Sequence, residues 1–539
     1  MTAIRAYHWL RVTVGTIVLV GAVMAFSDVG GWLGEKLVHT FFWTQFLPSA
    51  MAFLRGAGWA ALGFAAILVL TLLFGRVYCA MLCPLGVLMD FSAWLAGKRG
   101  RLRKLPWARG VPWLRAGVVV FGVGVLVFTG SMMALGMLDP YSLFGRVTTN
   151  LLRPLVGWGV NRAAYAGWAD PVKISAAPLG AVLTSAGLLA LVVGLAVKRG
   201  RLWCNTMCPV GAVLGAVSKF SVFRLRLEES ACVGCSLCER TCPAQCIDYK
   251  NNHVDHSRCI MCLKCVPNCR QAGIGLRLMW RKQRRESPAA EPTEPATSLP
   301  PSPAVSRRVF FAGAAILATS PGGGNGRGRG RGNGRGRGRG QGRHGKGGGR
   351  YSLRRPVLPP GARSLAHFQA TCTACHLCVA QCPQQVLRPS ITRFGLAGFL
   401  QPYQDYEVSF CDYDCNECSQ VCPTGAIQQI SVEERHGIQT GIAHFHRGRC
   451  IVKTNGTACG ACSEHCPTQA VHMIPFGDDL TIPEVTPELC IGCGACEHVC
   501  PARPDKAIVL DGLPVHGAAQ KIKLTGENTV REMEEEFPF

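Results

Sequence analysis

The stretch GRVYCAMLCPLG at residues 75–86 recurs as GRLWCNTMCPVG at residues 200–211, 125 positions further along the chain. The glycines at both ends, the arginine, both cysteines and the proline match in place. Each copy directly follows a long apolar segment. An internal repeat of this kind indicates a unit built twice. We therefore expect residues 1–220 to form one domain with two similar halves.

Apolar segments precede and follow the two copies. Each is near the length of about 20 residues that an α-helix needs to cross a bilayer. None of them contains Asp, Glu or His. Four such segments within 220 residues are hard to reconcile with the buried helices of a soluble protein. The sequence thus predicts a polytopic α-helical membrane domain of four helices with a twofold internal repeat, the spans being 10–26, 56–74, 112–135 and 176–197.

Basic residues between these segments predict the orientation of the domain. The connection 76–115 carries eight Lys and Arg, whereas the connection 27–55 carries two. The fourth segment ends in the basic sequence Lys198-Arg199-Gly200-Arg201. Connections rich in Lys and Arg stay on the cytoplasmic side. We expect both ends of the domain, and both copies of the repeat, at the cytoplasmic face of a bacterial inner membrane.

The repeat brings four thiols to one face of the membrane: Cys79, Cys83, Cys204 and Cys208. Residues four apart share one face of a helix, so each pair is expected on a single helical face. Two hypotheses stay open. The thiols form a cofactor-binding redox or metal site where the two halves meet, or they are structural thiols that close a helix end before proline.

The other cysteines fall mostly in short runs. The chain of 539 residues has 29 cysteines, and runs this dense favour metal binding over disulfides. Zinc sites favour two separated CxxC pairs, so zinc is the weaker alternative.

The net charge of +24 suggests nucleic acid as a possible partner. Because many basic residues lie beside apolar segments or in one low-complexity run, we expect no nucleic-acid partner.

Residues 221–280 carry two runs of the bacterial ferredoxin form C-x2-C-x2-C-x3-C. In such pairs the fourth Cys of each run ligates the other cluster. Cys246 is left over and is expected to be a small packing residue. Arg270 replaces the usual proline after the fourth Cys, so we expect a looser loop there. The predicted [4Fe-4S] ligand sets are Cys232, Cys235, Cys238 and Cys269 for one cluster, and Cys259, Cys262, Cys265 and Cys242 for the other.

Residues 281–360 read as a linker because their Pro-, Glu- and Ser-rich start cannot bury a core. Within it, Ser306-Arg307-Arg308-Val309-Phe310-Phe311 and the short apolar run that follows have the form of a twin-arginine export signal over 306–320. Residues 321–350 are rich in Gly and Arg. RNA binding is one hypothesis for this run. We favour a solvated linker, because no stacking aromatics lie nearby.

Residues 361–539 carry four more cysteine runs, two of them with a widened first gap. Sixteen thiols fit four further [4Fe-4S] clusters in a second α+β ferredoxin domain. Neighbouring runs could exchange their fourth Cys, or the first run could exchange with the last. The predicted ligands are Cys372, Cys375, Cys378 and Cys382; Cys411, Cys415, Cys418 and Cys422; Cys450, Cys459, Cys462 and Cys466; and Cys490, Cys493, Cys496 and Cys500.

No haem is expected in either half. Cys372, Cys375 and His376 satisfy the C-x-x-C-H attachment pattern, but attachment would orphan the other two thiols of that run. His8 and His39 are the only histidines before residue 250, and neither lies within a predicted span. A haem held between the membrane helices would need axial histidines there.

The repeated CxxxCP motifs, the four spans and the two terminal clusters make residues 1–280 resemble the membrane ferredoxin of the periplasmic nitrate reductase branch, the NapH type. The regulator of nitrous-oxide respiration (NosR type) and an oxidase-assembly factor (CcoG type) share the motif. Residues 301–510 are similar to the partner ferredoxin of the same branch, the NapG type. There the likeness rests on the twin-arginine segment, the sequence RRPVLPPGA at 354–362 and the four clusters. Two proteins usually made separately would then be joined here.

The resemblance implies a membrane-anchored carrier that relays electrons from the quinol pool to a periplasmic reductase, as the electron-transfer component of a quinol dehydrogenase. The implied partners are the quinone pool and a redox protein, either a terminal reductase or a cytochrome. The first ferredoxin domain would be cytoplasmic and the second periplasmic, although the basic 321–350 run opposes export. The alternative is a redox-sensing or metalloenzyme-assembly factor of the NosR or CcoG kind. No nucleotide, flavin or catalytic-triad motif occurs, so we expect no chemistry beyond electron transfer.

Overall fold

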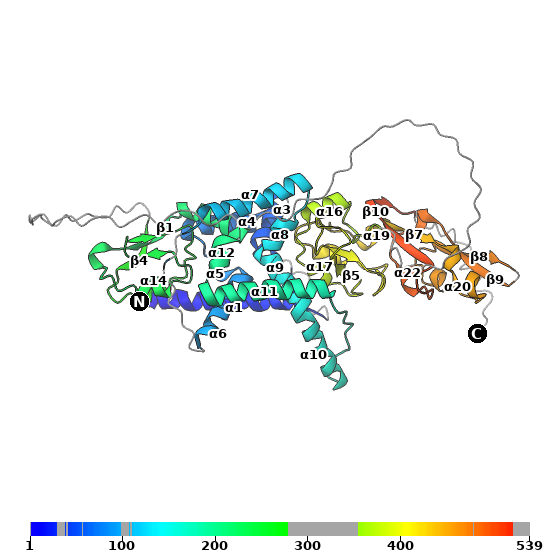
Figure 1. Ribbon diagram of the computed structural model, residues 1–539, viewed down its shortest axis with the longest axis horizontal. Coiled ribbons are helices and arrows are strands. Elements are labelled where there is room, and N and C mark those ends of the chain that lie inside the picture. The colour runs from blue at the N-terminus through cyan, green and yellow to red at the C-terminus, as the bar shows by residue number, and fades with distance from the viewer. Residues whose placement is uncertain are drawn as a thin grey trace, which may run out of the picture. The chain divides into compact units, whose positions relative to one another are not determined.

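The computed structural model describes residues 2–29, 38, 41–56, 58–98, 107, 110–278, 354–477 and 479–520 (Figure 1). His39, the twin-arginine-like segment 306–320 and the Gly/Arg run 321–350 lie outside these residues. The predicted linker ends earlier than expected. Val357 and Leu358 are buried in the core of the second ferredoxin region, so residues from 354 onward belong to that region.

Among the described residues of the first region, three helices are long and apolar enough to cross a membrane. They are α1 (Thr2–Ser27), α7 (Pro112–Thr129) and α11 (Leu179–Arg199), with the apolar stretches Ala6–Ser27, Pro112–Thr129 and Leu179–Arg199. Their outer faces are apolar, as contact with lipid requires; the side chain of Phe128 is 89% exposed. The remaining predicted span is the apolar helix α4 (Gly58–Phe74), which has only 17 residues. A four-helix membrane domain therefore stays a prediction.

The predicted span 112–135 was too long. Helix α7 ends at Thr129 because Gly130 takes the left-handed conformation, with φ of 62°, that terminates helices. The chain then forms α8 (Met133–Leu138), α9 (Pro140–Val147), the π-helical turn η1 (Thr148–Leu152) and α10 (Arg153–Tyr165) before α11. All eight residues of α9 are buried. The second ferredoxin region contacts this buried connection, where Arg146 donates hydrogen bonds to the carbonyl oxygens of Thr373 and Ala374.

Both copies of the repeat fold in the same way. In the first, α5 (Tyr78–Met81) ends just before Cys83, and α6 (Pro84–Lys98) starts at the following proline. In the second, α12 (Leu202–Thr206) is followed by α13 (Pro209–Val217), with Cys208 as its N-cap. Proline favours the first position of a new helix over a helix interior. The expectation that each cysteine pair lies on one continuous helical face was therefore wrong.

The first ferredoxin region has the expected α+β form. Strand β1 (Phe223–Leu227) pairs antiparallel with β4 (Ile274–Leu278), and β2 (Ile247–Asp248) pairs with β3 (His253–Val254). The short helices α14 (Leu237–Thr241) and α15 (Cys265–Asn268) lie between the strands in sequence and contact each other.

The second ferredoxin region repeats this scheme on a larger scale. Its two-stranded sheets pair β5 (Leu387–Pro389) with β6 (Pro402–Gln404), β7 (Ile438–Phe445) with β10 (Ile508–Ala518), and β8 (Val471–Phe476) with β9 (Leu480–Val485). Short helices occur at the cysteine runs: α17 (Leu377–Ala380), α18 (Glu417–Gln420), α21 (Ala461–Glu464) and α22 (Ala495–Val499).

Each end of α1 contacts a different ferredoxin region. Near its start, Tyr7 Oη donates a hydrogen bond to the carbonyl oxygen of Met261 at 2.8 Å. Near its end, the carbonyl oxygen of Ala25 accepts one from Gln381 Nε2 at 3.0 Å. At 1.5 Å rise per residue, the two contacts on α1 are about 27 Å apart along one membrane-length helix.

Candidate metal centres and thiol site

Four of the cysteine loops share an uncommon backbone conformation. The residues directly before and after the second cysteine are left-handed, with φ between 52° and 83°. Successive residues of this kind turn backbone N–H groups toward one side, a concavity typical of anion and iron–sulfur sites. The pairs are Gly234 and Ser236, Met261 and Leu263, Ala374 and His376, and Gly492 and Gly494.

A second shared turn follows the fourth cysteine. The third residue after it is left-handed in five of the six runs, with φ between 50° and 62°. Ala272 keeps this conformation even though Arg270 stands where the other runs have proline. The prediction of a looser loop at Arg270 finds no support in this geometry. The five residues are Gln245, Ala272, Gln385, Gly425 and Gln469.

The two widened runs reach a similar arrangement differently. Asn416 and Gly460, which follow their second cysteines, have φ of −127° and −122°. The extra residues of the longest gap form helix α20 (Ile451–Asn455), which ends at the left-handed Gly456. A longer first gap gives the chain more freedom to place its cysteines, so the left-handed pair is not needed there.

Thiols from different runs come together in the first ferredoxin region. Cys238 lies close enough to Cys232, Cys269 and Cys235 to interact electrostatically with them. Cys265 interacts most strongly with Cys262, Cys259 and Cys242, and more weakly with Cys238. These groupings resemble the predicted ligand sets, which stay predictions. Cys246 is buried beside them, with its Sγ atom 3.5 Å from that of Cys242.

In the second region, thiols of neighbouring runs lie close together. Cys378 interacts with Cys375, Cys372 and then Cys422, and Cys418 with Cys411, Cys382 and Cys415. Likewise Cys462 interacts with Cys459, Cys500 and Cys450, and Cys496 most strongly with Cys493, Cys490 and Cys466. These contacts favour exchange between neighbours over exchange between the first and last runs.

Among the residues that the structure describes, no three Cys, His, Asp or Glu side chains come close enough to share one ion. The predicted donor sets consist of thiols alone, which are the ligands that iron–sulfur clusters use.

His376 is buried rather than an ordinary polar loop residue. Its Nε2 lies 2.9 Å from the carbonyl oxygen of Leu400, and only 1% of the residue is exposed. This contact occupies the ring nitrogen that a haem iron would otherwise use.

The four repeat thiols lie in one buried core, and two arginines cross between the motif copies. Arg76 Nη2 donates to the carbonyl oxygen of Cys204 at 3.1 Å and lies 3.8 Å from the Sγ of Cys79. Arg201 Nη1 donates to the carbonyl oxygen of Cys79 at 3.0 Å and lies 3.9 Å from the Sγ of Cys204. Each arginine thus bonds to the backbone of the other copy and lies near a cysteine of its own copy, as expected from a duplicated unit.

The last glycine of each motif makes this crossing possible. A Cβ atom on Gly86 would lie 2.5 Å from the carbonyl oxygen of Cys79 and 2.6 Å from Arg201 Nη1. On Gly211 it would lie 2.2 Å from the carbonyl oxygen of Cys204 and 2.8 Å from Arg76 Nη2. The backbone N–H groups of Gly86 and Gly211 also donate to the Sγ atoms of Cys83 and Cys208, at 3.4 Å and 3.3 Å.

The thiol site has an excess of buried positive charge. Arg76 is fully buried and makes no ion pair with a carboxylate among the described residues. Arg201 pairs with Asp90 at 2.9 Å, but the same carboxylate also pairs with Arg11 at 3.3 Å. Burial raises the pKa of Cys83, Cys204 and Cys208, so free thiols here are neutral near pH 7. An unpaired buried cation is costly, so an anionic occupant would stabilise this site.

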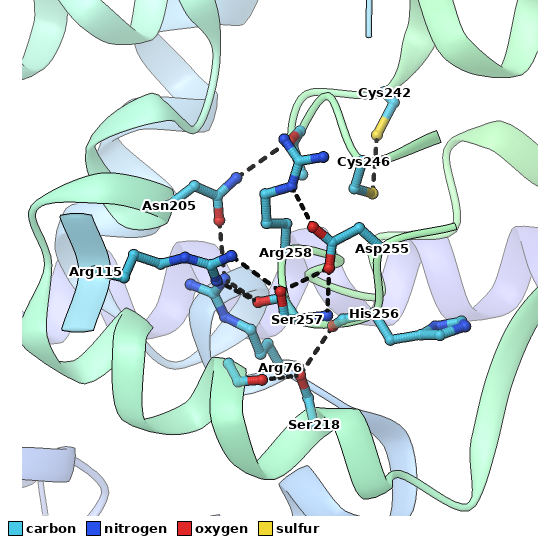
Figure 2. Close-up of polar contacts among 12 residues, drawn as sticks. Arg76, Arg115, Asn205, Ser218, Cys242, Cys246, Asp255, His256, Ser257 and Arg258 are labelled. Atoms are coloured by element: carbon cyan, nitrogen blue, oxygen red, sulfur yellow. Dashed lines mark hydrogen bonds and ion pairs between the residues drawn. The ribbon is translucent and has the colours of Figure 1, made fainter. Parts of the chain in front are cut away.

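Figure 2 shows how Arg76 and Asn205, one from each copy of the motif, are joined to the loop at Ser257 in the first ferredoxin region. Arg76 Nη1 bonds to Asn205 Oδ1 at 2.8 Å and to the carbonyl oxygen of Ser257 at 3.1 Å. Arg115, from α7, bonds to the same carbonyl and to the Ser257 hydroxyl, both at 3.0 Å. Asp255 accepts from that hydroxyl at 2.6 Å and from Arg258 at 2.7 Å. The loop leading into the run at Cys259 is therefore held by arginines of the membrane region.

Two further buried arginines contact the cysteine loops of the second region. Arg435 Nη2 donates to the Sγ of Cys411 at 3.5 Å. Arg146, on α9, donates to the carbonyl oxygens of Thr373 and Ala374, both at 3.3 Å. Hydrogen bonds and positive charge near cluster sulfurs tune the reduction potential. Sequence reasoning missed both residues, since neither belongs to a cysteine motif.

Three models of known protein families match parts of the chain. A model described as a 4Fe-4S binding domain matches residues 57–102 and 181–228, which contain the two copies of the repeat. Models described as 4Fe-4S dicluster domains match residues 371–427 and 455–503. Each dicluster match spans cysteines of two neighbouring runs. No solved structure matches the chain.

Several curated proteins are similar. The methylamine utilization ferredoxin-type protein MauN of Methylorubrum extorquens is 30% identical over 254 residues, which cover 44% of this chain and 76% of that protein. The chain belongs to the NapH/MauN type of membrane polyferredoxin. The ferredoxin-type protein NapH of Haemophilus influenzae is 27% identical over 221 residues, 38% of this chain and 64% of that protein. MauM of Methylobacillus flagellatus, also a methylamine utilization ferredoxin-type protein, is 31% identical over 175 residues, 30% of this chain and 71% of that protein.

This polyferredoxin is a membrane-associated iron–sulfur electron-transport protein with further 4Fe-4S dicluster domains. Its duplicated thiol motif was visible in the sequence, and the two crossing arginines match in place in both copies. The contact of each arginine with the opposite copy could not be predicted from spacing, because it depends on how the two halves pack.

Proposed function

We propose that the polyferredoxin relays electrons from the quinol pool to a reductase through six [4Fe-4S] clusters. The observation that carries this proposal is one continuous buried core that contains Cys262, the four repeat thiols and Cys375. Cys262 belongs to the first ferredoxin region and Cys375 to the second, so this core connects the two regions. Electron carriers placed along it would form a path from one end of a membrane-length helix to the other.

The clusters would use the thiols that lie together. In the first region the sets are Cys232, Cys235, Cys238 with Cys269, and Cys259, Cys262, Cys265 with Cys242. In the second region the fourth ligands are exchanged between neighbours: Cys422 joins the run at Cys372, Cys382 the run at Cys411, Cys500 the run at Cys450, and Cys466 the run at Cys490. The electrostatic contacts and the dicluster matches support these sets. Iron in these clusters would supply one-electron redox chemistry, and the chain supplies thiolates, N–H groups and buried arginines.

The four repeat thiols would hold an anionic metal centre rather than serve as structural thiols. The excess of buried arginine charge supports this, because thiolates held by a metal would compensate Arg76 and Arg201. Tyr78, and Tyr141 on α9, are both buried in the same core as the four repeat thiols and Cys375.

We further propose that the chain joins a NapH/MauN-type and a NapG/MauM-type ferredoxin, with the second ferredoxin region in the periplasm. The similarity to both MauN and MauM supports the fusion. The contacts of the two regions with opposite ends of α1 support the two-sided arrangement. Protease added to intact spheroplasts would then digest residues 361–539 and spare the first region. Protection of residues 361–539 would contradict this part of the proposal.

Anaerobic stopped-flow measurement tests the relay. The purified full-length protein, mixed with a quinol analogue, should lose cluster absorbance on a turnover timescale and pass the electrons to an added acceptor. Dithionite serves as a control reductant that needs no quinol site. Full reduction by dithionite with none by quinol would instead favour a redox-sensing or assembly role.

A further inference from the structure

An apolar cavity lies where the membrane region meets the first ferredoxin region. Its volume is about 600 Å³, within the range of small-molecule sites. One wall comes from the start of α1, a second from the end of α4, and a third from the cysteine loop that contains Cys262. The lining residues that carry the argument are Tyr7, Leu10, Leu70, Phe74, Met261 and Leu263. A ligand entering between two apolar helices would come from the bilayer.

The cysteine-loop wall shows an unusual choice of residues. Met261 and Leu263 flank Cys262 and are left-handed, with φ of 52° and 54°. The other loops of this kind have Gly, Ser, Ala or His at the equivalent positions. Large apolar side chains are unfavourable in this conformation, and such strain tends to persist at functional sites. Here it directs two apolar side chains into the cavity, beside a cysteine of a proposed cluster.

One polar side chain reaches the same cavity. Tyr7 Oη donates its proton to the carbonyl oxygen of Met261 at 2.8 Å, which leaves its oxygen lone pairs free to accept a hydrogen bond. Tyr7 also lies close enough to Cys262 and Cys259 to interact with them electrostatically. A mostly apolar pocket with one orienting polar group suits an aromatic ring bearing hydroxyl groups on a lipophilic tail.

We propose that this cavity binds a lipophilic quinol and delivers its electrons to the cluster held by Cys259, Cys262, Cys265 and Cys242. The inference rests on the proposed electron relay and specifies its entry site. Tyr7 accepts a hydrogen bond from one quinol hydroxyl, and the apolar walls hold the ring and the start of the tail. Oxidation of one quinol to quinone would release two electrons, which a cluster held by these cysteines would accept one at a time, and two protons, which would pass to the solvent.

The test uses the full-length protein, purified anaerobically in detergent. Leu70→Trp fills the cavity, and Leu72→Trp makes the same change on α4 at a side chain that is 42% exposed and does not line the cavity. We expect reduction of the clusters by a short-tailed quinol to slow at least tenfold in Leu70→Trp and to stay within twofold of wild type in Leu72→Trp. Reduction by dithionite should be the same in all three proteins. Tyr7→Phe should weaken quinol binding several-fold without changing the dithionite rate.

The outcomes separate this inference from the relay itself. If the wild type is reduced by quinol and Leu70→Trp is reduced equally fast, the cavity proposal is wrong and the relay stands. If quinol does not reduce even the wild type, the proposed relay of electrons from quinol is itself contradicted. Photolabelling of the wild type with an azidoquinone guards against misfolding of the variants. Labelled peptides should contain residues 4–10, 70–82, 261–266 or 276, and labelling confined to other parts of the chain would overturn the proposal.

Discussion

Arg76 donates a hydrogen bond to the carbonyl oxygen of Cys204 at 3.1 Å, across the boundary between the two halves of the membrane region. Arg201 returns the same contact to Cys79 at 3.0 Å. Each arginine belongs to one copy of the repeat and contacts the backbone of the other. The duplicated motif therefore builds one shared site rather than two separate ones. Because the site contains buried positive charge, mutation of its arginines can test whether it holds an anion.

Replacing Arg76 by methionine tests whether the four repeat thiols hold an anion. With an anionic centre present, Arg76→Met removes its buried counter-charge and should lower stability by about 3 kcal/mol. With neutral thiols only, the same change would relieve an unpaired buried charge and raise stability. Thermal unfolding in detergent, together with iron content, gives the sign. We expect a lower melting temperature and loss of metal beyond the six clusters.

Arg277→Met is the matched control. Arg277 pairs with Glu228 at 3.2 Å, but its side chain is 47% exposed. Surface ion pairs contribute about 0–1 kcal/mol, so this variant should unfold close to the wild-type temperature. An Arg76→Met protein more stable than both would show that the thiol site holds no anion.

Alanine at the last glycine of either motif should prevent the crossing contacts. The added Cβ would lie 2.2 Å from the carbonyl oxygen of Cys204 in Gly211→Ala, and 2.5 Å from that of Cys79 in Gly86→Ala. The backbone cannot move aside without a large loss of stability. Each variant should therefore be less stable by about 3 kcal/mol or more, as in severe overpacking, or fail to accumulate in the membrane. Gly187→Ala, on α11 with no atom within 4 Å of the new Cβ, is the control and should accumulate normally. Wild-type behaviour of Gly211→Ala would contradict the packing.

The sequence predicted what depends on local pattern. The cysteine runs, the α+β character of both ferredoxin regions and three membrane-length helices follow from spacing and apolar length. The helix break at Pro84 could also be predicted, because proline disfavours a helix interior. The four-residue spacing of the cysteines, taken alone, instead suggests one continuous helix. The roles of Arg146 and Arg435 could not be predicted from the sequence, because their contacts are with elements distant in sequence. Whether neighbouring runs exchange ligands likewise depends on how the loops fold together.

Asp139 should make stability depend on pH. It caps α9 by accepting from the Ser142 N–H at 2.7 Å, and burial raises the pKa of its carboxyl from 3.8 to about 6. Because the folded pKa lies above the unfolded one, the folded state favours the protonated form. The resulting stabilisation is complete below pH 3.8 and is lost as pH rises through 6, a difference of about 3 kcal/mol. Asp139→Asn keeps a cap acceptor and should raise the melting temperature at pH 7 but not at pH 4.

Asp170→Asn, at an exposed carboxyl, is the control for that experiment and should leave the pH profile of unfolding unchanged. A profile for Asp139→Asn that parallels wild type between pH 4 and 7 would show that Asp139 is not the group responsible.

The exchange of ligands between neighbouring runs predicts a non-additive loss of iron. If Cys372 and Cys422 hold the same cluster, Cys372→Ala and Cys422→Ala should each remove about four of about 24 cluster irons, and the double variant should lose no more. Cys372 and Cys382 belong to one run but to different clusters, so Cys372→Ala combined with Cys382→Ala should lose about eight. Anaerobic iron analysis and the spectra of the remaining clusters measure both. Cys246→Ala, which lacks a cluster role, should retain all of the iron. Equal losses in the two double variants would show that each run keeps its own fourth cysteine.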